Sequence, residues 1–105
     1  MARVEIFFPD LPEETYSRLQ NELEKELTYT FGGCSVVQGV KGLYLSQRGR
    51  IEQDRINLLF TDIEFRFSED FAELEEYVEY LHRAIISTLS EEKVLIVVHS
   101  VFHQT

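Results

Sequence analysis

Residues 31–67 read FGGCSVVQGVKGLYLSQRGRIEQDRINLLFTDIEFRF, and this stretch decides the fold. It is rich in β-branched and aromatic residues, and the segment QRGR at residues 47–50 divides it in two. The pattern predicts a long β-hairpin that runs from residue 34 to about residue 65. Gly39 and Gly42 lie inside the first strand, where glycine indicates a bulge or a close backbone approach.

A strand and a helix are expected before the hairpin. Residues 3–8 (RVEIFF) have strand composition and are followed by Pro9. Residues 10–13 (DLPE) then have the form of a helix start, with Asp10 as the N-cap. The helix should present one apolar face and stop at Gly32-Gly33. That face consists of Tyr16, Leu19, Leu23, Leu27 and Phe31.

A helix and a strand are expected after the hairpin. The helix should begin near Ser68 or Asp70, and the strand should run from Lys93 to Val98 or slightly further. The helix has an apolar stripe at helical spacing, formed by Phe71, Leu74, Val78, Leu81, Ile85 and Leu89. Within the hairpin, residues 58–60 are continuously apolar, which predicts a central strand buried on both faces.

The element order is therefore β-α-β-β-α-β in one domain spanning residues 1–105. With right-handed crossovers this order predicts an α+β ferredoxin-like plait. Its four-stranded antiparallel sheet has the strand order 4-1-3-2, and both helices cover one face. An α+β sandwich with a differently ordered sheet is the alternative.

The composition narrows the classes of partner. The chain has 105 residues, a formal net charge of −9 and a pI of about 4.7. An acidic body repels phosphate backbones and anionic lipid, so we expect neither nucleic-acid nor membrane binding. The N-terminal residues do not resemble a targeting peptide, and no apolar run is long enough to span a bilayer. We expect a cytoplasmic protein.

No catalytic, metal or cofactor motif is recognisable, and we predict none of the three. Cys34 is the only cysteine and follows a helix C-terminus, where a thiol is not activated. His99 and His103 are four residues apart, which in a strand separates them by about 13 Å. These two and His82 are therefore interpreted as surface histidines.

Basic residues gather in the hairpin, where Lys41, Arg48, Arg50 and Arg55 are four of the ten in the chain. Arginine forks bind carboxylate or phosphate, so this region predicts a contact with an acidic protein or a small anionic ligand. The alternative is a solvated turn whose arginines balance nearby carboxylates. Tyr44 could serve as a ligand platform, although such a tyrosine commonly packs on a neighbouring strand.

The strands are apolar on both alternating sets of positions. Helices cover only one face of a plait, so the other face of a monomer would expose an apolar patch. This pattern predicts a homodimer built through the sheet face. The expected interface residues are Phe7, Leu59, Ile63, Leu95 and Val97.

The segment 31–60 resembles the pattern GG-x-[ST]-x₃-G-x-G-[YW]…G…E-x₃-L of a family of small bacterial domains of unknown function. The likeness covers about a third of the chain, with Ser35 and Gly42 displaced by one residue. It is carried by Gly32, Gly33, Ser35, Gly39, Gly42 and Tyr44. The resemblance implies a ferredoxin-like fold and no activity.

The element order is also similar to that of dimeric α/β-barrel proteins, which include cofactor-free monooxygenases, and of small trimeric signalling or metal-tolerance proteins. The favoured function is a small oligomeric binding or regulatory module that is not an enzyme. The alternatives are a cofactor-independent enzyme of the dimeric-barrel type and a structural assembly partner. An enclosed pocket lined by Tyr44 and a histidine would favour the enzyme.

Overall fold

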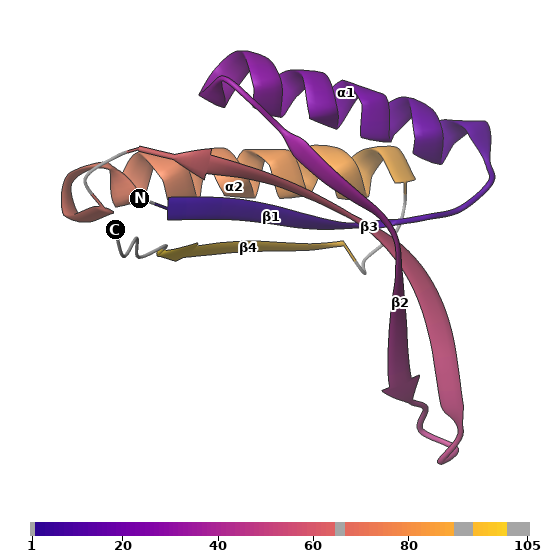
Figure 1. Ribbon diagram of the computed structural model, residues 1–105. Coiled ribbons are helices and arrows are strands. Elements are labelled where there is room, and N and C mark those ends of the chain that lie inside the picture. Colours follow the sequence, from indigo (N-terminus) through magenta and orange to yellow (C-terminus); the bar gives the residue numbers. More distant parts are fainter. Residues whose placement is uncertain (1, 65–66, 90–93, 101–105) are drawn as a thin grey trace.

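The computed structural model describes residues 2–64, 67–89 and 94–100, and its four strands and two helices form a ferredoxin-like plait (Figure 1). The sheet is antiparallel with the order β2-β3-β1-β4, which is the predicted 4-1-3-2 order read from the other edge. The elements are β1 (Ala2–Pro9), α1 (Glu14–Phe31), β2 (Ser35–Leu45), β3 (Ile51–Ile63), α2 (Phe67–Leu89) and β4 (Leu95–Ser100).

Both helices lie on one face of the sheet, and the core fills the space between the two layers (Figure 1). Alternation along β1 buries every second residue beneath the helices. Ala2, Val4, Ile6 and Phe8 have no exposed surface. Ile6 and Phe8 pack with Leu59 of β3 and with four helix residues, Leu23, Leu27, Leu81 and Ile85. Ala2 and Val4 pack with Leu74 of α2. The opposite face carries no described element, and we call it the bare face.

The helix boundaries differ from the predicted starts. Helix α1 begins at Glu14, with Glu13 as the N-cap and no side-chain cap, so the prediction that Asp10 caps it is wrong. The backbone N–H of Asp10 donates instead to the carbonyl of Arg55 (3.0 Å), which continues the pairing of β1 with β3. Helix α2 begins at Phe67, slightly before the predicted start.

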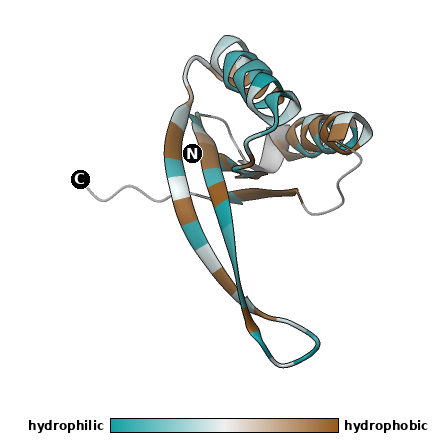
Figure 2. Ribbon diagram, turned by 90° about the vertical axis from the view of Figure 1, so that its right-hand side faces the viewer, coloured by the Kyte–Doolittle hydropathy of each residue, from teal (hydrophilic) through white to brown (hydrophobic). Residues whose placement is uncertain are grey.

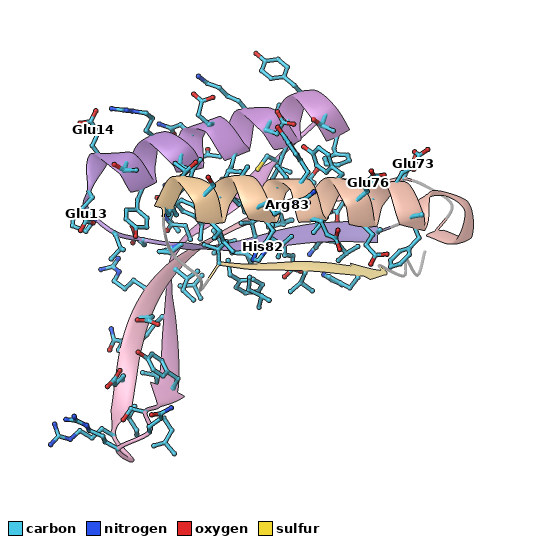
Figure 3. The ribbon with its side chains drawn as sticks, turned by 180° about the vertical axis from the view of Figure 1, so that it is seen from behind. Glu13, Glu14, Glu73, Glu76, His82 and Arg83 are labelled. Atoms are coloured by element: carbon cyan, nitrogen blue, oxygen red, sulfur yellow. The ribbon has the colours of Figure 1, made fainter. Side chains whose placement is uncertain are left out.

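The end of α1 is as expected. Gly32 has a left-handed backbone (φ 92°), and its N–H donates to the carbonyl of Thr28 at 2.8 Å. Among the helix residues whose side chains the structure describes, the acidic ones are exposed, apart from the half-buried Glu24. Figure 3 shows this arrangement for Glu13 and Glu14 at the start of α1 and for Glu73 and Glu76 on α2.

The outer halves of β2 and β3 project beyond the two layers (Figure 1). The register of β1 with β3 ends at Ile56, and apart from the bond between Asp10 and Arg55, residues 41–55 pair only with each other. We call these residues the arm. At its tip, Gly49 has φ 76° and donates its N–H to the carbonyl of Ser46 (3.0 Å). The predicted turn and its positive-φ glycine are confirmed.

A bulge lies in β2 close to the point where the arm leaves the sheet. The register shifts between Val37 and Val40, and Gly39 has φ 68°. A residue with a side chain would be strained in this conformation. The bulge predicted from the glycines of β2 is therefore confirmed at Gly39. The central position predicted for β3 is also confirmed, because β3 pairs with both β2 and β1.

Candidate functional site

The structure does not bring the four predicted contact residues together. Arg48 and Arg50 are exposed at the tip of the arm, and neither guanidinium has a side-chain partner among the described residues. Arg55 lies at the base of the arm, where its Nε is 3.6 Å from Oδ2 of Asp10. The tip is thus the freely available part of the basic region.

Tyr44 lies on the arm and is already hydrogen-bonded. Its hydroxyl donates to Oε2 of Glu52 across the hairpin at 2.7 Å, and this bond raises the pKa of the phenol. His82 lies on α2 and His99 on β4, whereas Tyr44 is on the projecting part of β2. The pocket combining Tyr44 with a histidine, which would favour an enzyme, is not formed by these residues.

The bare face is built from three rows of residues that cross β3, β1 and β4. The apolar row at the arm end is Leu58–Phe7–Leu95, the middle row is Phe60–Glu5–Val97, and the charged row is Asp62–Arg3–His99. Of the residues predicted to form the oligomer interface, Phe7, Leu95 and Val97 lie on this face. One end of the face is therefore apolar and the other is charged.

Leu59 and Ile63 lie on the helix-covered side of the sheet, so the prediction that they share the uncovered face with Phe7 is corrected. Leu59 is fully buried in the core under the helices, and Ile63 packs against Ala2 and Val4 on the same side. Successive strand residues alternate between faces, and β3 is apolar on both. The sequence pattern of β3 alone cannot tell which set faces the helices.

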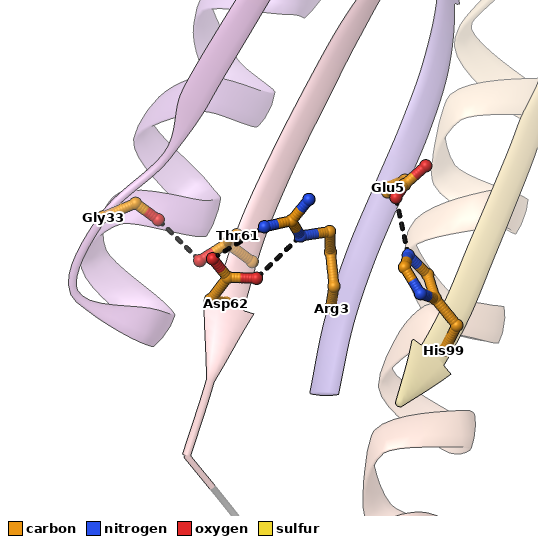
Figure 4. Close-up of polar contacts among 6 residues, drawn as sticks. All are labelled: Arg3, Glu5, Gly33, Thr61, Asp62 and His99. Atoms are coloured by element: carbon orange, nitrogen blue, oxygen red, sulfur yellow. Dashed lines mark hydrogen bonds and ion pairs between the residues drawn. The ribbon is translucent and has the colours of Figure 1, made fainter. Parts of the chain in front are cut away.

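The charged row forms a polar network that the sequence analysis did not identify (Figure 4). The guanidinium of Arg3 donates to both carboxylate oxygens of Asp62, at 2.7 and 3.1 Å, and lies 4.5 Å from the ring centre of Phe60. Nε2 of His99 lies 2.6 Å from Oε1 of Glu5. Alternating charges at Arg3 and Glu5 in an otherwise apolar strand were the available sequence signal.

A hydrogen bond beside the charged row joins β3 to the segment that follows α1. The hydroxyl of Thr61 donates to the carbonyl of Gly33 at 2.6 Å (Figure 4). Thr61 is buried, so this bond satisfies a polar group in the core. It fixes the start of β2 against its neighbour.

A hollow on the bare-face side lies at the base of the arm and has a volume of about 610 Å³. We call it the base hollow. It is lined by Phe7, Pro9, Asp10, Leu11, Gln53, Asp54, Arg55, Ile56 and Leu95. Its walls are mainly apolar, with the paired charges of Arg55 and Asp10 at one side. The hollow continues the apolar row of the bare face toward the arm.

The histidines and Cys34 are engaged in structural contacts. Nε2 of His82 lies 3.0 Å from the carbonyl oxygen of Val94, and His103 is outside the described residues. Burial raises the pKa of the Cys34 thiol, and the nearby carboxylate of Glu24 raises it further, which disfavours a thiolate.

Within residues 2–64, 67–89 and 94–100, no three His, Cys, Asp or Glu side chains gather as metal ligands would. No helix in this part of the chain has the length and apolar character of a membrane span.

No protein-family model matches the chain, and no curated protein matches its sequence. Its structure is similar to solved structures of CutA1 proteins. CutA1 from Oryza sativa is 16% identical with a TM-score of 0.59, over 99% of this chain and 82% of the other. The divalent cation tolerance protein Cut A1 from Thermus thermophilus is 18% identical with a TM-score of 0.58, over 100% and 88%. The likeness is one of fold. It agrees with the ferredoxin-like architecture that the hairpin resemblance implied.

Proposed function

We propose that the chain is a small cytosolic binding module that associates with further copies of itself through the bare face and the arm. The observation that carries the proposal is the apolar surface left at the junction of these two parts. The described helices cover only the other face, and the arm leaves the two layers altogether (Figure 1). The single free cysteine, Cys34, suits a reducing compartment.

The exposed apolar residues lie on both parts of this surface. Leu95 on the bare face is 56% exposed, and Leu45 and Ile51 near the tip of the arm are 71% and 75% exposed. Apolar bands also run along the arm in Figure 2. Soluble monomers seldom leave contiguous apolar patches of this kind open to water, and burying one drives association. A homodimer that includes Phe7, Leu95 and Val97 would cover the apolar end of the bare face.

The tip of the arm supports the binding part of the proposal. Arg48 and Arg50 are exposed on a chain whose net charge is −9, so the tip is a local basic point on an acidic body. Guanidinium groups without an internal partner remain available to carboxylate or phosphate. We propose an acidic protein or a small anionic ligand as the partner at the tip.

Sedimentation at micromolar concentrations tests the association. We expect the wild-type chain to sediment as an oligomer and the Leu95→Glu variant to dissociate, because a charge would be buried in the interface. Tyr29→Glu is the matched control, since Tyr29 is exposed on α1, away from the bare face. A monomeric wild-type chain, or dissociation caused equally by both substitutions, would refute the proposal.

A further inference from the structure

A second hollow lies on the other side of the β1 end from the base hollow, against α1 and the β2 bulge. We call it the amide hollow. Its volume is about 310 Å³, at the lower end of the range of about 300–1,000 Å³ that small-molecule sites occupy. Its walls are more polar than those of the base hollow. It is lined by Pro9, Asp10, Leu11, Tyr16, Ser17, Gln20, Asn21, Glu24, Gln38 and Asn57.

The bulge places polar groups of β2 at this hollow. Gln38 and Gly39 have no partner residue in the β2–β3 ladder, since Val37 pairs with Leu58 and Val40 with Ile56. Bulges redirect side chains and are frequent beside binding sites. Gln38 lines the hollow, and the N–H of Gly39 donates to Oδ1 of Asn57 at 3.0 Å.

A chain of side-chain hydrogen bonds holds the floor of the hollow in one arrangement. Asn57 is 7% exposed, and its Nδ2 donates to Oε1 of Gln20 at 2.8 Å. Nε2 of Gln20 in turn donates to Oε2 of Glu24 at 3.2 Å. Together with Gly39, these residues form a directed series from the β2 bulge to α1. A floor ordered in this way needs little rearrangement to receive a ligand.

Two further amides at the hollow are free. Among the described residues, neither the side-chain amide of Asn21 nor that of Gln38 has a hydrogen-bond partner, and both residues are exposed. Each offers a carbonyl acceptor and two N–H donors. The internal bond of Asn57 uses one of its two N–H donors, which leaves the second. The hollow therefore presents both hydrogen-bond donors and hydrogen-bond acceptors to a ligand.

The composition of the lining excludes several ligand classes. An anion would face the carboxylates of Asp10 and Glu24 with no basic residue in the lining to receive it. Arg55 does not line the hollow and is paired with Asp10. A divalent cation would prefer a set dominated by carboxylates, whereas four of the lining side chains are amides. Hydroxyl groups match amides best, because each hydroxyl both donates and accepts.

We propose that the amide hollow binds a neutral polyhydroxylated molecule the size of a monosaccharide or a cyclitol. Its hydroxyls would donate to Glu24 and to the free amide oxygens, and would accept from the N–H groups of Asn21 and Gln38. The half-buried ring of Tyr16 supplies an apolar wall for the C–H face of such a ligand. This site is separate from the tip and from the bare face, so it does not depend on the proposed self-association.

Titration of the full chain by two-dimensional amide NMR tests the proposal, with glucose, galactose and myo-inositol as the probes. We expect at least one of the three to give saturable shifts at the signals of Gly39, Gln20 and the Asn57 side chain. Asn21→Ala plus Gln38→Ala should weaken that binding about tenfold, which corresponds to losing one or two neutral hydrogen bonds. Gln53→Ala is the matched control, because Gln53 is an exposed amide that lines the base hollow.

Three results would overturn the inference. The first is the absence of saturable shifts with all three probes. The second is the same set of shifts with putrescine or inorganic phosphate but not with the polyols. The third is an equal loss of binding in the Gln53→Ala control. Sedimentation of the same samples separates this inference from the proposed function. Polyol binding by a chain that stays monomeric would refute self-association and leave the amide hollow supported.

Discussion

The backbone N–H of Gly39 donates to Oδ1 of Asn57 at 3.0 Å, and this bond joins the β2 bulge to the centre of β3. Asn57 is buried and also donates to Gln20, so replacing it removes two hydrogen bonds, those to the N–H of Gly39 and to Oε1 of Gln20. We predict that Asn57→Ala lowers the free energy of unfolding by about 1–3 kcal/mol. Urea denaturation measures the change. Asn21→Ala, an exposed amide without an internal partner, should change it by less than about 0.5 kcal/mol.

Two neighbouring leucines of β3 lie on opposite faces of the sheet, and replacing each in turn tests which face is buried. Leu59 is fully buried in the core, whereas Leu58 is half-buried on the bare face. We predict that Leu59→Ala costs about 2–5 kcal/mol, the range for deleting a core leucine. Leu58→Ala should cost clearly less in dilute solution, where the chain is dissociated. Thermal unfolding at several concentrations compares them, and equal losses would show that the faces are assigned wrongly.

The fold was predictable because its local signals agree with one another. Glycines at the end of α1, in the bulge and at the tip each mark a left-handed backbone, at Gly32, Gly39 and Gly49. The helical stripes and the two-sided apolar strands then allow few arrangements of six elements. The exception was Asp10, which has the sequence of a helix cap but donates its N–H across to β3. Tertiary pairing there outweighed a local preference.

The candidate sites were much less predictable, because they depend on contacts between distant residues. The choice between Leu58 and Leu59 depends on the packing of β3 against the helices, and both leucines look alike in an apolar run. The series from Gly39 through Asn57 to Gln20 joins three elements, and Asn57 and Gln20 are 37 positions apart in the sequence. Nothing in the sequence marks such a pair. The sequence placed the exposed tip, where no tertiary contact intervenes, and the bare-face positions of Phe7, Leu95 and Val97.

We predict that the free energy of unfolding decreases at alkaline pH because the phenol of Tyr77 loses its proton. Burial raises the pKa of its phenol from 10.0 to about 12, and its hydroxyl donates to Oε1 of Glu26 at 2.8 Å. The native state holds this proton to a higher pH than the unfolded chain. The contribution of the protonated Tyr77 phenol to the free energy of unfolding is therefore complete below about pH 10 and is lost as the pH rises toward 12. Ultraviolet titration of the phenolates should show a late component that Tyr77→Phe removes. An unchanged titration in that variant would contradict the assignment.

We predict that the chain is stable without a metal ion. His99 contacts Glu5 and His82 contacts the carbonyl of Val94, so both imidazoles already have partners. Treatment with a chelator should leave the thermal midpoint unchanged, and dialysis against Zn²⁺ should not raise it. A fall of several degrees would show that His82, His99 or His103 had been discounted wrongly.

The tip of the arm offers a test that separates binding from folding. Arg48 and Arg50 are exposed and their guanidinium groups lack internal partners among the described residues, so their charges add little to stability. Arg48→Ala plus Arg50→Ala should change the free energy of unfolding by less than about 0.5 kcal/mol. The double variant should nevertheless lose binding to an acidic protein or an anionic ligand, and the loss should be larger at low salt, where charges are less screened.

Gly49→Val is the contrasting variant for the same turn. Gly49 has φ 76° and open space around it, so the cost of a β-branched side chain there comes from the backbone and not from a clash. We expect a loss of about 1–3 kcal/mol. Denaturant unfolding should detect a loss of stability in Gly49→Val and not in the double alanine variant. A binding assay should detect the loss of binding in the double alanine variant. If the double alanine variant unfolds instead, Arg48 and Arg50 are paired inside the oligomer, and the tip is part of the contact between copies.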